Sequence, residues 1–191
     1  MSSEFKKCKG VDCDKDIPKG LIPYCSYKCR DTVIEPPDRL KKRKARKSTT
    51  SVTKRLKKEL WFEFSRYIRM RDALKTTGDI YNLACVTCET VKPTISVDAG
   101  HFITSVKSYI KFDEKNVHGQ CKKCNMPPDP GEQYLYSLAM VNMYGQAEID
   151  RLQSERNLIK KWTQLELEYA IEHYRLQNEE WYEVYGKPWA N

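Results

Sequence analysis

The chain has 191 residues, of which 40% are hydrophobic and 31% are charged, and its formal net charge is +8 at pH 7. This length allows one modest hydrophobic core with a smaller accessory module and excludes two large domains. No run of about eighteen apolar residues is present and the N-terminus opens with charged residues, so we expect a cytoplasmic protein with no membrane contact.

The positive charge is concentrated in the first third of the chain. Residues 1–60 contain 18 basic and 8 acidic side chains, whereas residues 61–191 contain 16 and 18. Such a block predicts a polyanionic partner, which is either nucleic acid or an anionic membrane face. Because no apolar segment would anchor the chain in a membrane, nucleic acid is favoured.

Residues 1–35 are predicted to form an N-terminal zinc-binding module. Four cysteines stand there among glycines and prolines with little hydrophobic periodicity: Cys8, Cys13, Cys25 and Cys29. In a reducing compartment, cysteines are better explained as thiolate ligands than as disulfides. The segment has almost no core residues, so a bound zinc ion is the simplest way to fold it. The alternative is a disordered tail with free thiols.

Residues 36–58 are predicted to form a basic linker or arm. Between Arg39 and Lys58, eleven of twenty residues are Lys or Arg and none is acidic. The Ser-Thr-Thr-Ser sequence at residues 48–51 interrupts this run, so we expect the arm to be helical at most in part. Its side chains are expected to contact DNA phosphates irrespective of base sequence. They are Arg39, Lys41, Lys42, Arg43, Lys44, Arg46, Lys47, Lys54, Arg55, Lys57 and Lys58.

An amphipathic helix is predicted from near Thr53 to near Gly78. Its apolar positions follow a three-to-four spacing: Leu56, Leu60, Phe64, Tyr67 and Leu74. Such an apolar stripe must pack on another part of the chain. The short apolar runs at residues 95–97 and 102–106 are typical of strands.

Helices are also predicted after residue 130, over residues 134–144 and 147–158, with Gly145 between them. The last helix begins with a capping box, Thr163 to Glu166, and continues through Trp181. The aromatic residues near its end can stack on bases, although at helical spacing they more often pack inside a protein. They are Trp181, Tyr182, Tyr185 and Trp189.

A second zinc site is predicted from two CxxC pairs: Cys85, Cys88, Cys121 and Cys124. Each pair can place two sulfur atoms on one side of a tight knuckle, and two pairs complete a tetrahedral four-thiolate site. Zinc would then close a loop of about thirty residues and contribute on the order of 10 kcal/mol to folding. The alternative is four unrelated buried cysteines.

Polar residues suited to phosphodiester hydrolysis lie inside this closed loop or directly after it: Asp98, His101, Asn116, His118 and Asn125. The reaction needs a base for water, a divalent cation for the phosphate charge and groups that hold both in place. His101 can be the base, whereas Asp98, His118 and Asn125 can supply oxygen or nitrogen ligands. Each histidine taken singly can equally be a structural residue beside zinc.

The motif from Cys85 to Asn125 resembles the phage NinG (Rap) recombination endonucleases, which belong to the HNH (ββα-metal) nuclease superfamily. It comprises the first CxxC, Asp-Ala-Gly-His-Phe at 98–102, Phe-Asp-Glu-x-Asn-Val-His at 112–118, and Gln-Cys-x-x-Cys-Asn at 120–125. The resemblance implies that His101 is the general base, that Asn116 orients its loop and that Asn125 is the final metal ligand.

Two departures from these patterns concern the metal ligands. Many HNH enzymes carry a metal-binding residue directly before the base, where this chain has Gly100. On a regular strand Asp98 and His101 face opposite sides, so Asp98 can serve only if Gly100 lets the backbone bend. Pro128-Asp129-Pro130-Gly131-Glu132 stands where the family has Lys-Ser-Gly-Asn. Either Asp129 or Glu132 replaces a missing ligand, or the activity is altered.

The sequence therefore predicts an α+β protein. An HNH-like nuclease domain at residues 59–191 follows the N-terminal zinc module and the basic arm in the chain. Its ββα-metal core is closed by zinc and flanked by helices. The resemblance implies cleavage of branched recombination DNA such as Holliday junctions or D-loops, with two zinc ions and Mg²⁺ or another divalent cation. It also implies a bacterial host cell and phage or host recombination proteins as partners, and a homodimer is compatible with it. The alternative is a non-catalytic zinc protein that binds DNA.

Overall fold

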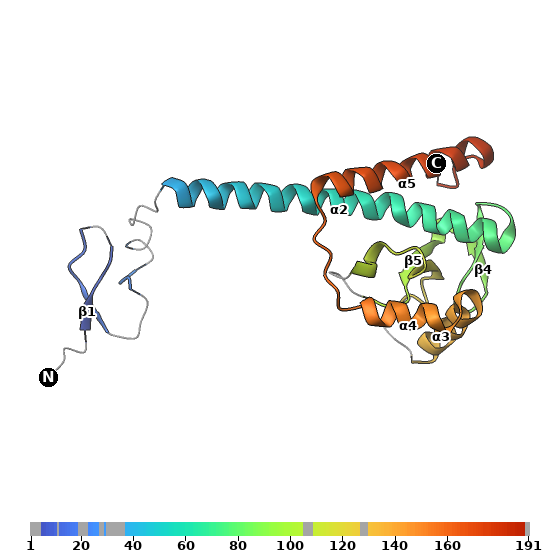
Figure 1. Ribbon diagram of the computed structural model, residues 1–191, viewed down its shortest axis with the longest axis horizontal. Helices are drawn as coiled ribbons and strands as arrows, with labels where there is room; N and C mark the ends of the chain where they lie inside the picture. Colours follow the sequence, from blue (N-terminus) through green and yellow to red (C-terminus); the bar gives the residue numbers. More distant parts are fainter. Residues whose placement is uncertain are drawn as a thin grey trace. The chain divides into compact units, whose positions relative to one another are not determined.

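The computed structural model describes residues 5–10, 12–18, 23–26, 29, 37–104, 109–126 and 130–189, with the side chains of 37–51, 130 and 131 outside the described set. The chain divides into two compact units, residues 1–50 and residues 51–191. Figure 1 shows the elements of both units. In the described part of the chain, no helix combines the length and apolar character needed to cross a membrane.

The described part of the first unit includes a small antiparallel hairpin. Strand β1 (Phe5–Lys7) pairs with β2 (Asp16–Pro18), with Lys6 opposite Ile17. Among its described residues only Cys8 and Ile17 are buried hydrophobics. So small a core in the described part of the unit fits the expectation that a metal supports it.

Helix α2 (Pro37–Thr77) is much longer than the sequence predicted. It includes residues 37–58 of the basic arm, so the expectation that the arm would be helical at most in part is wrong. Lys, Arg, Ala and Leu are good helix formers, and no glycine or proline follows Pro37 until Gly78. Four hydroxyl residues in the middle are not enough to break such a run. Gly78 ends the helix with φ of 79°.

Two small antiparallel sheets form the centre of the second unit. Strand β3 (Asn82–Ala84) pairs with β4 (Val91–Pro93), and β5 (Val97–His101) pairs with β6 (Val117–Cys121). The strands predicted at 95–97 and 102–106 are therefore misplaced, and residues 105 and 106 lie outside the described set. Residues 94–96 form a short 3-10 turn. Apolar runs misled the prediction because β5 consists largely of small and polar residues.

Helices cover the sheet β5–β6 on both faces. Figure 1 shows α2 on one face and α3 and α4 on the other, with α5 beyond α2. One cluster joins α2, α5 and β6, and includes Phe64, Val117 and Ile171. The other joins Phe102 at the end of β5 to α3 and α4. The helices are α3 (Pro130–Tyr144), α4 (Gln146–Glu155) and α5 (Gln164–Tyr185).

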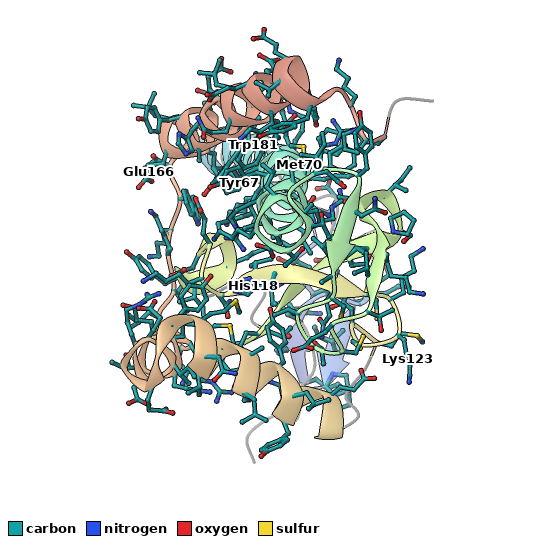
Figure 2. All side chains as sticks on the ribbon, turned by 90° about the vertical axis from the view of Figure 1, so that its right-hand side faces the viewer. Tyr67, Met70, His118, Lys123, Glu166 and Trp181 are labelled. Carbon is teal, nitrogen blue, oxygen red and sulfur yellow. The ribbon has the colours of Figure 1, made fainter. Side chains whose placement is uncertain are left out.

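Helix α5 packs along the second half of α2. The rings of Tyr67 and Trp181, both labelled in Figure 2, stack with centroids 5.1 Å apart. The Asn178 side chain donates to the Glu63 carbonyl on α2 at 3.1 Å. The predicted capping box at Thr163 is confirmed, since the Thr163 hydroxyl accepts from the Glu166 amide and the Glu166 carboxylate accepts from the Thr163 amide.

Candidate active site and metal centres

The four cysteines of the CxxC pairs form one compact cluster. The first pair lies between β3 and β4 and the second begins at Cys121, the last residue of β6, so the cluster joins the two sheets. All four sulfur atoms lie within 4.8 Å of one another, and Cys88 and Cys121 are 3.9 Å apart. Tetrahedral zinc with bonds of about 2.3 Å separates its sulfurs by about 3.8 Å. The donor set and spacing therefore fit a structural zinc ion.

The N-terminal cysteines form a second cluster of the same kind. Cys25 lies 3.6 Å from Cys13 and 3.3 Å from Cys29, measured between sulfur atoms. The amides of Gly10 and Cys25 donate to the Cys8 sulfur at 3.4 Å and 3.2 Å, and these bonds help to lower the pKa of Cys8 to about 7. Since the thiolate is the metal-binding form, such amides prepare the site for a cation. The predicted grouping of the eight cysteines into two sets of four is confirmed, and each set could hold a metal ion.

His101 is the last residue of β5, and its imidazole stacks on the indole of Trp61 from α2. The ring centroids are 5.0 Å apart and the planes differ by 12°. Nε2 lies 2.9 Å from the Lys111 carbonyl oxygen. A carbonyl only accepts, so Nε2 carries the proton and Nδ1 of the neutral ring keeps a lone pair. Burial lowers the pKa of His101, which keeps this ring neutral at physiological pH.

Asn116 holds the loop that joins β5 to β6. Its side chain is fully buried and forms three hydrogen bonds to backbone groups. Oδ1 accepts from the Ile103 amide at 2.9 Å, while Nδ2 donates to the carbonyls of Ile103 at 3.1 Å and Ile110 at 3.0 Å. Because Lys111 directly follows Ile110, the same amide fixes the carbonyl that orients His101.

Asp98 and Asn125 lie side by side, since the Asn125 amide donates to the Asp98 carboxylate at 3.2 Å. Strand β5 pairs with β6 through all five residues without a bulge, so the bend considered at Gly100 is absent. Asn125 itself comes near Gly100. A Cβ at position 100 would lie 2.9 Å from Oδ1 of Asn125 and closer still to Oε1 of Gln120. Glycine therefore leaves room for two side-chain oxygens at this point.

Gln120 is a residue of this group that the sequence reasoning missed. Its Nε2 donates to the Thr87 hydroxyl at 2.8 Å and to the Cys124 carbonyl at 2.9 Å. Since a carbonyl accepts only, these bonds fix which end of the amide is nitrogen and turn Oε1 toward Gly100. Its place directly before the second CxxC was the only signal available in the sequence.

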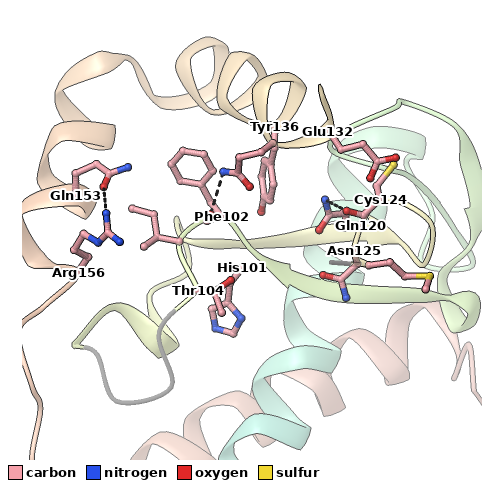
Figure 3. Close-up of a pocket in the computed structure, with 13 residues that line it drawn as sticks. His101, Phe102, Thr104, Gln120, Cys124, Asn125, Glu132, Tyr136, Gln153 and Arg156 are labelled. Atoms are coloured by element: carbon pink, nitrogen blue, oxygen red, sulfur yellow. Dashed lines mark hydrogen bonds between the residues drawn. The ribbon is translucent and has the colours of Figure 1, made fainter. Parts of the chain in front are cut away.

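A cavity of about 420 Å³ brings these side chains together (Figure 3). It is lined by His101, Gln120, Asn125 and Glu132, among other residues. Figure 3 shows His101 and Phe102 leaving β5 toward opposite sides, as neighbours on a strand do. Asp98 is not among the lining residues and reaches the group only through Asn125. Asp129 lies outside the described residues.

His118 is not brought to this cavity. Its side chain is 2% exposed, and Nδ1 lies 3.3 Å from the Asp72 carboxylate and 3.1 Å from a guanidinium nitrogen of Arg71. Nε2 lies 3.3 Å from the Lys115 carbonyl. Figure 2 labels His118 between the α2 layer and the α3 layer. Both ring nitrogens are therefore engaged by other groups of the chain. The sequence left His118 as either a metal ligand or a structural residue, and this arrangement favours the structural role.

The comparison with protein families identifies the relationship. The family model described as "Bacteriophage Lambda NinG protein" matches residues 3–181. The chain belongs to the NinG family. Curated NinG proteins of Escherichia phage 933W, Escherichia phage lambda and Salmonella phage P22 are 33%, 31% and 31% identical over 98 residues. That region is 51% of this chain and 43% of each relative, so the match spans less than half of their length. No solved structure matches the chain.

The NinG family match includes both cysteine clusters and every residue of the cavity, and it ends before the last ten residues. The structure describes four of the predicted DNA-binding side chains. Lys54, Arg55 and Lys58 are exposed on α2, and Lys57 is partly buried. The other predicted side chains, Arg39, Lys41, Lys42, Arg43, Lys44, Arg46 and Lys47, lie outside the described set.

Proposed function

We propose that this NinG protein is a divalent-cation-dependent DNA endonuclease of the HNH (ββα-metal) type. The observation that carries the proposal is the neutral, oriented imidazole of His101, which lines the same cavity as a set of side-chain oxygens. Strands β5 and β6 are followed by helix α3, which is the order of elements in a ββα-metal core. The four cysteines of the CxxC pairs close the segment that contains the two strands. Both features support the superfamily placement. Fold alone would not establish an activity, so the proposal rests on the chemistry of the site.

His101 has the properties of a general base for water. Nε2 is held by the Lys111 carbonyl, Asn116 holds that segment, and Trp61 covers one face of the ring. Nδ1 is thereby left as the one nitrogen that can take a proton. In the proposed step, a water molecule loses a proton to Nδ1 while its oxygen attacks phosphorus. The bond from phosphorus to the leaving deoxyribose oxygen breaks, and solvent protonates that oxygen.

The oxygens around Gly100 fit a hard divalent cation such as Mg²⁺. Oδ1 of Asn125 and Oε1 of Gln120 converge within 2.9 Å of a single point, and the Asp98 carboxylate adjoins Asn125. Glu132 lines the same cavity. Carboxylate and amide oxygens are the ligands that Mg²⁺ uses in proteins. A bound cation would neutralise charge on the phosphate and on the leaving oxygen.

Branched recombination DNA is the substrate that we propose for this site. The family relationship is the main support. The surface chemistry adds to it, because nothing in the described part of the chain resembles a recognition helix for a DNA groove, while the basic residues suit backbones. A nuclease that contacts mainly phosphates needs a restraint other than base sequence. The angles and unstacked bases at a branch supply one.

The test is cleavage of a labelled four-way junction and of an equal-length linear duplex by purified protein, at fixed salt, with and without Mg²⁺. We expect Mg²⁺-dependent cutting that favours the junction. A parallel preparation of His101→Ala controls for contaminating nucleases. Equal cutting of both substrates would remove the recombination role. Junction binding without any cutting would replace this proposal with its alternative, a non-catalytic DNA-binding zinc protein.

A further inference from the structure

The chain turns back after α5 and lays an aromatic ring on α2. Gly186 has φ of 83° and its amide caps α5 by donating to the Tyr182 carbonyl at 2.9 Å. The Trp189 indole nitrogen then donates to the Tyr182 hydroxyl, also at 2.9 Å. The ring of Trp189 lies 4.8 Å from the guanidinium carbon of Arg69 and 5.2 Å from that of Arg66. One indole therefore contacts two arginines.

These two arginines are held as a pair of like charges. Burial and the charge of Arg66 both lower the pKa of Arg69, and among nearby carboxylates the charge of Asp98 opposes them. Among the described residues, no carboxylate forms an ion pair with either guanidinium. By contrast, Arg175 on α5 pairs with both Glu59 and Glu172. Two like charges held close together in this way favour an anion as a ligand.

The flat contacts leave N–H groups of both guanidiniums available for such an anion, while one N–H of Arg66 also interacts with the Tyr182 hydroxyl. Arg66 lies 3.9 Å over the ring of Phe62, whose side chain is 49% exposed. Stacking occupies the face of a guanidinium and leaves its N–H edge available. Arg69 donates from Nε to the Ser65 carbonyl at 3.0 Å and from Nη1 to the Val97 carbonyl at 3.3 Å, which positions its remaining nitrogen.

The pair lies beside the candidate active site. Val97 directly precedes Asp98, so Arg69 reaches the start of β5, while Trp61 stacks on His101 at its end. Trp61 and Arg69 are eight residues apart on α2, which is about 12 Å at 1.5 Å per residue. This distance is the length of a few nucleotides of DNA backbone, since each nucleotide advances about 3.4 Å along the duplex axis.

We propose that Arg66 and Arg69, held together by Trp189, bind a DNA backbone phosphate a few nucleotides from the one that is cleaved. The assignment rests on the proposed function, because it concerns the strand bound at His101. It also gives a role to the C-terminal aromatic residues. Trp189 packs on α2, as the sequence favoured, and through this packing it builds a surface for phosphate rather than a platform for bases.

The test measures binding of a four-way junction by fluorescence anisotropy over a range of salt concentrations, in the His101→Ala background so that no substrate is cut. Arg66→Gln is the main variant, because Arg69 also donates to two backbone carbonyls and its replacement disturbs them as well. We expect binding to weaken by roughly fivefold to tenfold and the salt slope to fall by about 0.9. Arg69→Gln is expected to act in the same way, with Arg69→Lys as its charge-preserving partner.

Arg175→Gln is the matched control, because the charge of Arg175 is already neutralised by two glutamates and both its affinity and its salt slope are expected to stay at the parent values. If Arg66→Gln and Arg69→Gln behave like this control, the phosphate site is wrong whatever the protein cleaves. A third result would separate the two proposals. If the His101→Ala protein binds the junction and the Arg66 and Arg69 variants weaken this binding, but the wild-type protein never cuts, the phosphate site is supported and the proposed nuclease activity is wrong.

Discussion

Replacing Asn116 by alanine is expected to lower the free energy of unfolding by about 3 to 5 kcal/mol. The change removes three hydrogen bonds from a side chain that is fully buried. The amide and the carbonyl of Ile103 lose this partner inside the protein, and each buried group left unsatisfied costs about 1 to 3 kcal/mol. The Ile110 carbonyl is less affected, since it also accepts from the Asp113 amide at 3.2 Å.

A reduction of this size is a large share of the roughly 5 to 15 kcal/mol that stabilises a typical domain. Urea unfolding of the zinc-saturated protein measures it, and with a slope of about 2 kcal/mol/M the midpoint is expected to fall by about 2 M. Asn142→Ala is the matched control, because Asn142 is exposed on α3. That variant is expected to stay within about 0.5 kcal/mol of the wild type. A decrease below about 1 kcal/mol in Asn116→Ala would refute the assigned role.

Asn116→Asp adds a pH test of the same geometry. The new carboxyl can still accept from the Ile103 amide, but its second oxygen faces the two carbonyls to which Nδ2 donates. The folded state therefore favours the protonated acid, which raises its pKa above the unfolded value. Stability that is missing at neutral pH should return as the pH falls toward about 4. A penalty that does not change with pH would argue against close contact with those carbonyls.

The other predictions concern metal content, catalysis and the arm. Elemental analysis should find two zinc ions per chain, and one ion would remove the N-terminal site. His101→Ala should abolish cleavage while leaving junction binding and zinc content unchanged. The base acts in its neutral form and burial lowers the pKa of His101, so the cleavage rate should fall only at a pH below the usual histidine pKa. Trp61→Leu exposes the ring and should move this inflection of the pH–rate profile to higher pH. Neutralising four arm residues should flatten the salt dependence of binding by up to about 0.9 for each phosphate that the arm no longer neutralises; they are Lys41, Lys42, Arg43 and Lys44.

Each of these has a contrary result. Wild-type cleavage by His101→Ala would remove the base assignment, whereas loss of fold would favour a structural histidine. An inflection that stays in place in Trp61→Leu would show that the indole does not set the environment of the ring. A salt slope unaffected by the four arm substitutions would show that this part of α2 does not contact DNA.

Much of the candidate site could be predicted because its chemistry follows local spacing. Two CxxC pairs can close on one ion whatever surrounds them, and a capping box needs only residues three apart. The helix around Phe64 also followed from its spacing. The position of β5 did not, because its small and polar residues form a strand only through pairing with β6 and the cover of two helices.

By itself the sequence indicated which residues are chemically suited to act: eight thiols in two sets, two histidines of which His101 was the expected base, and a basic first third. The tertiary structure decided which of them meet. Three contacts join residues that lie far apart in the chain. Trp61 stacks on His101, Asp72 pairs with His118, and Trp189 contacts Arg66 and Arg69. No periodicity encodes such contacts, because they arise when α2 is packed against β5, β6 and the end of α5. That packing assigned His118 to the interior and left His101 beside the cavity.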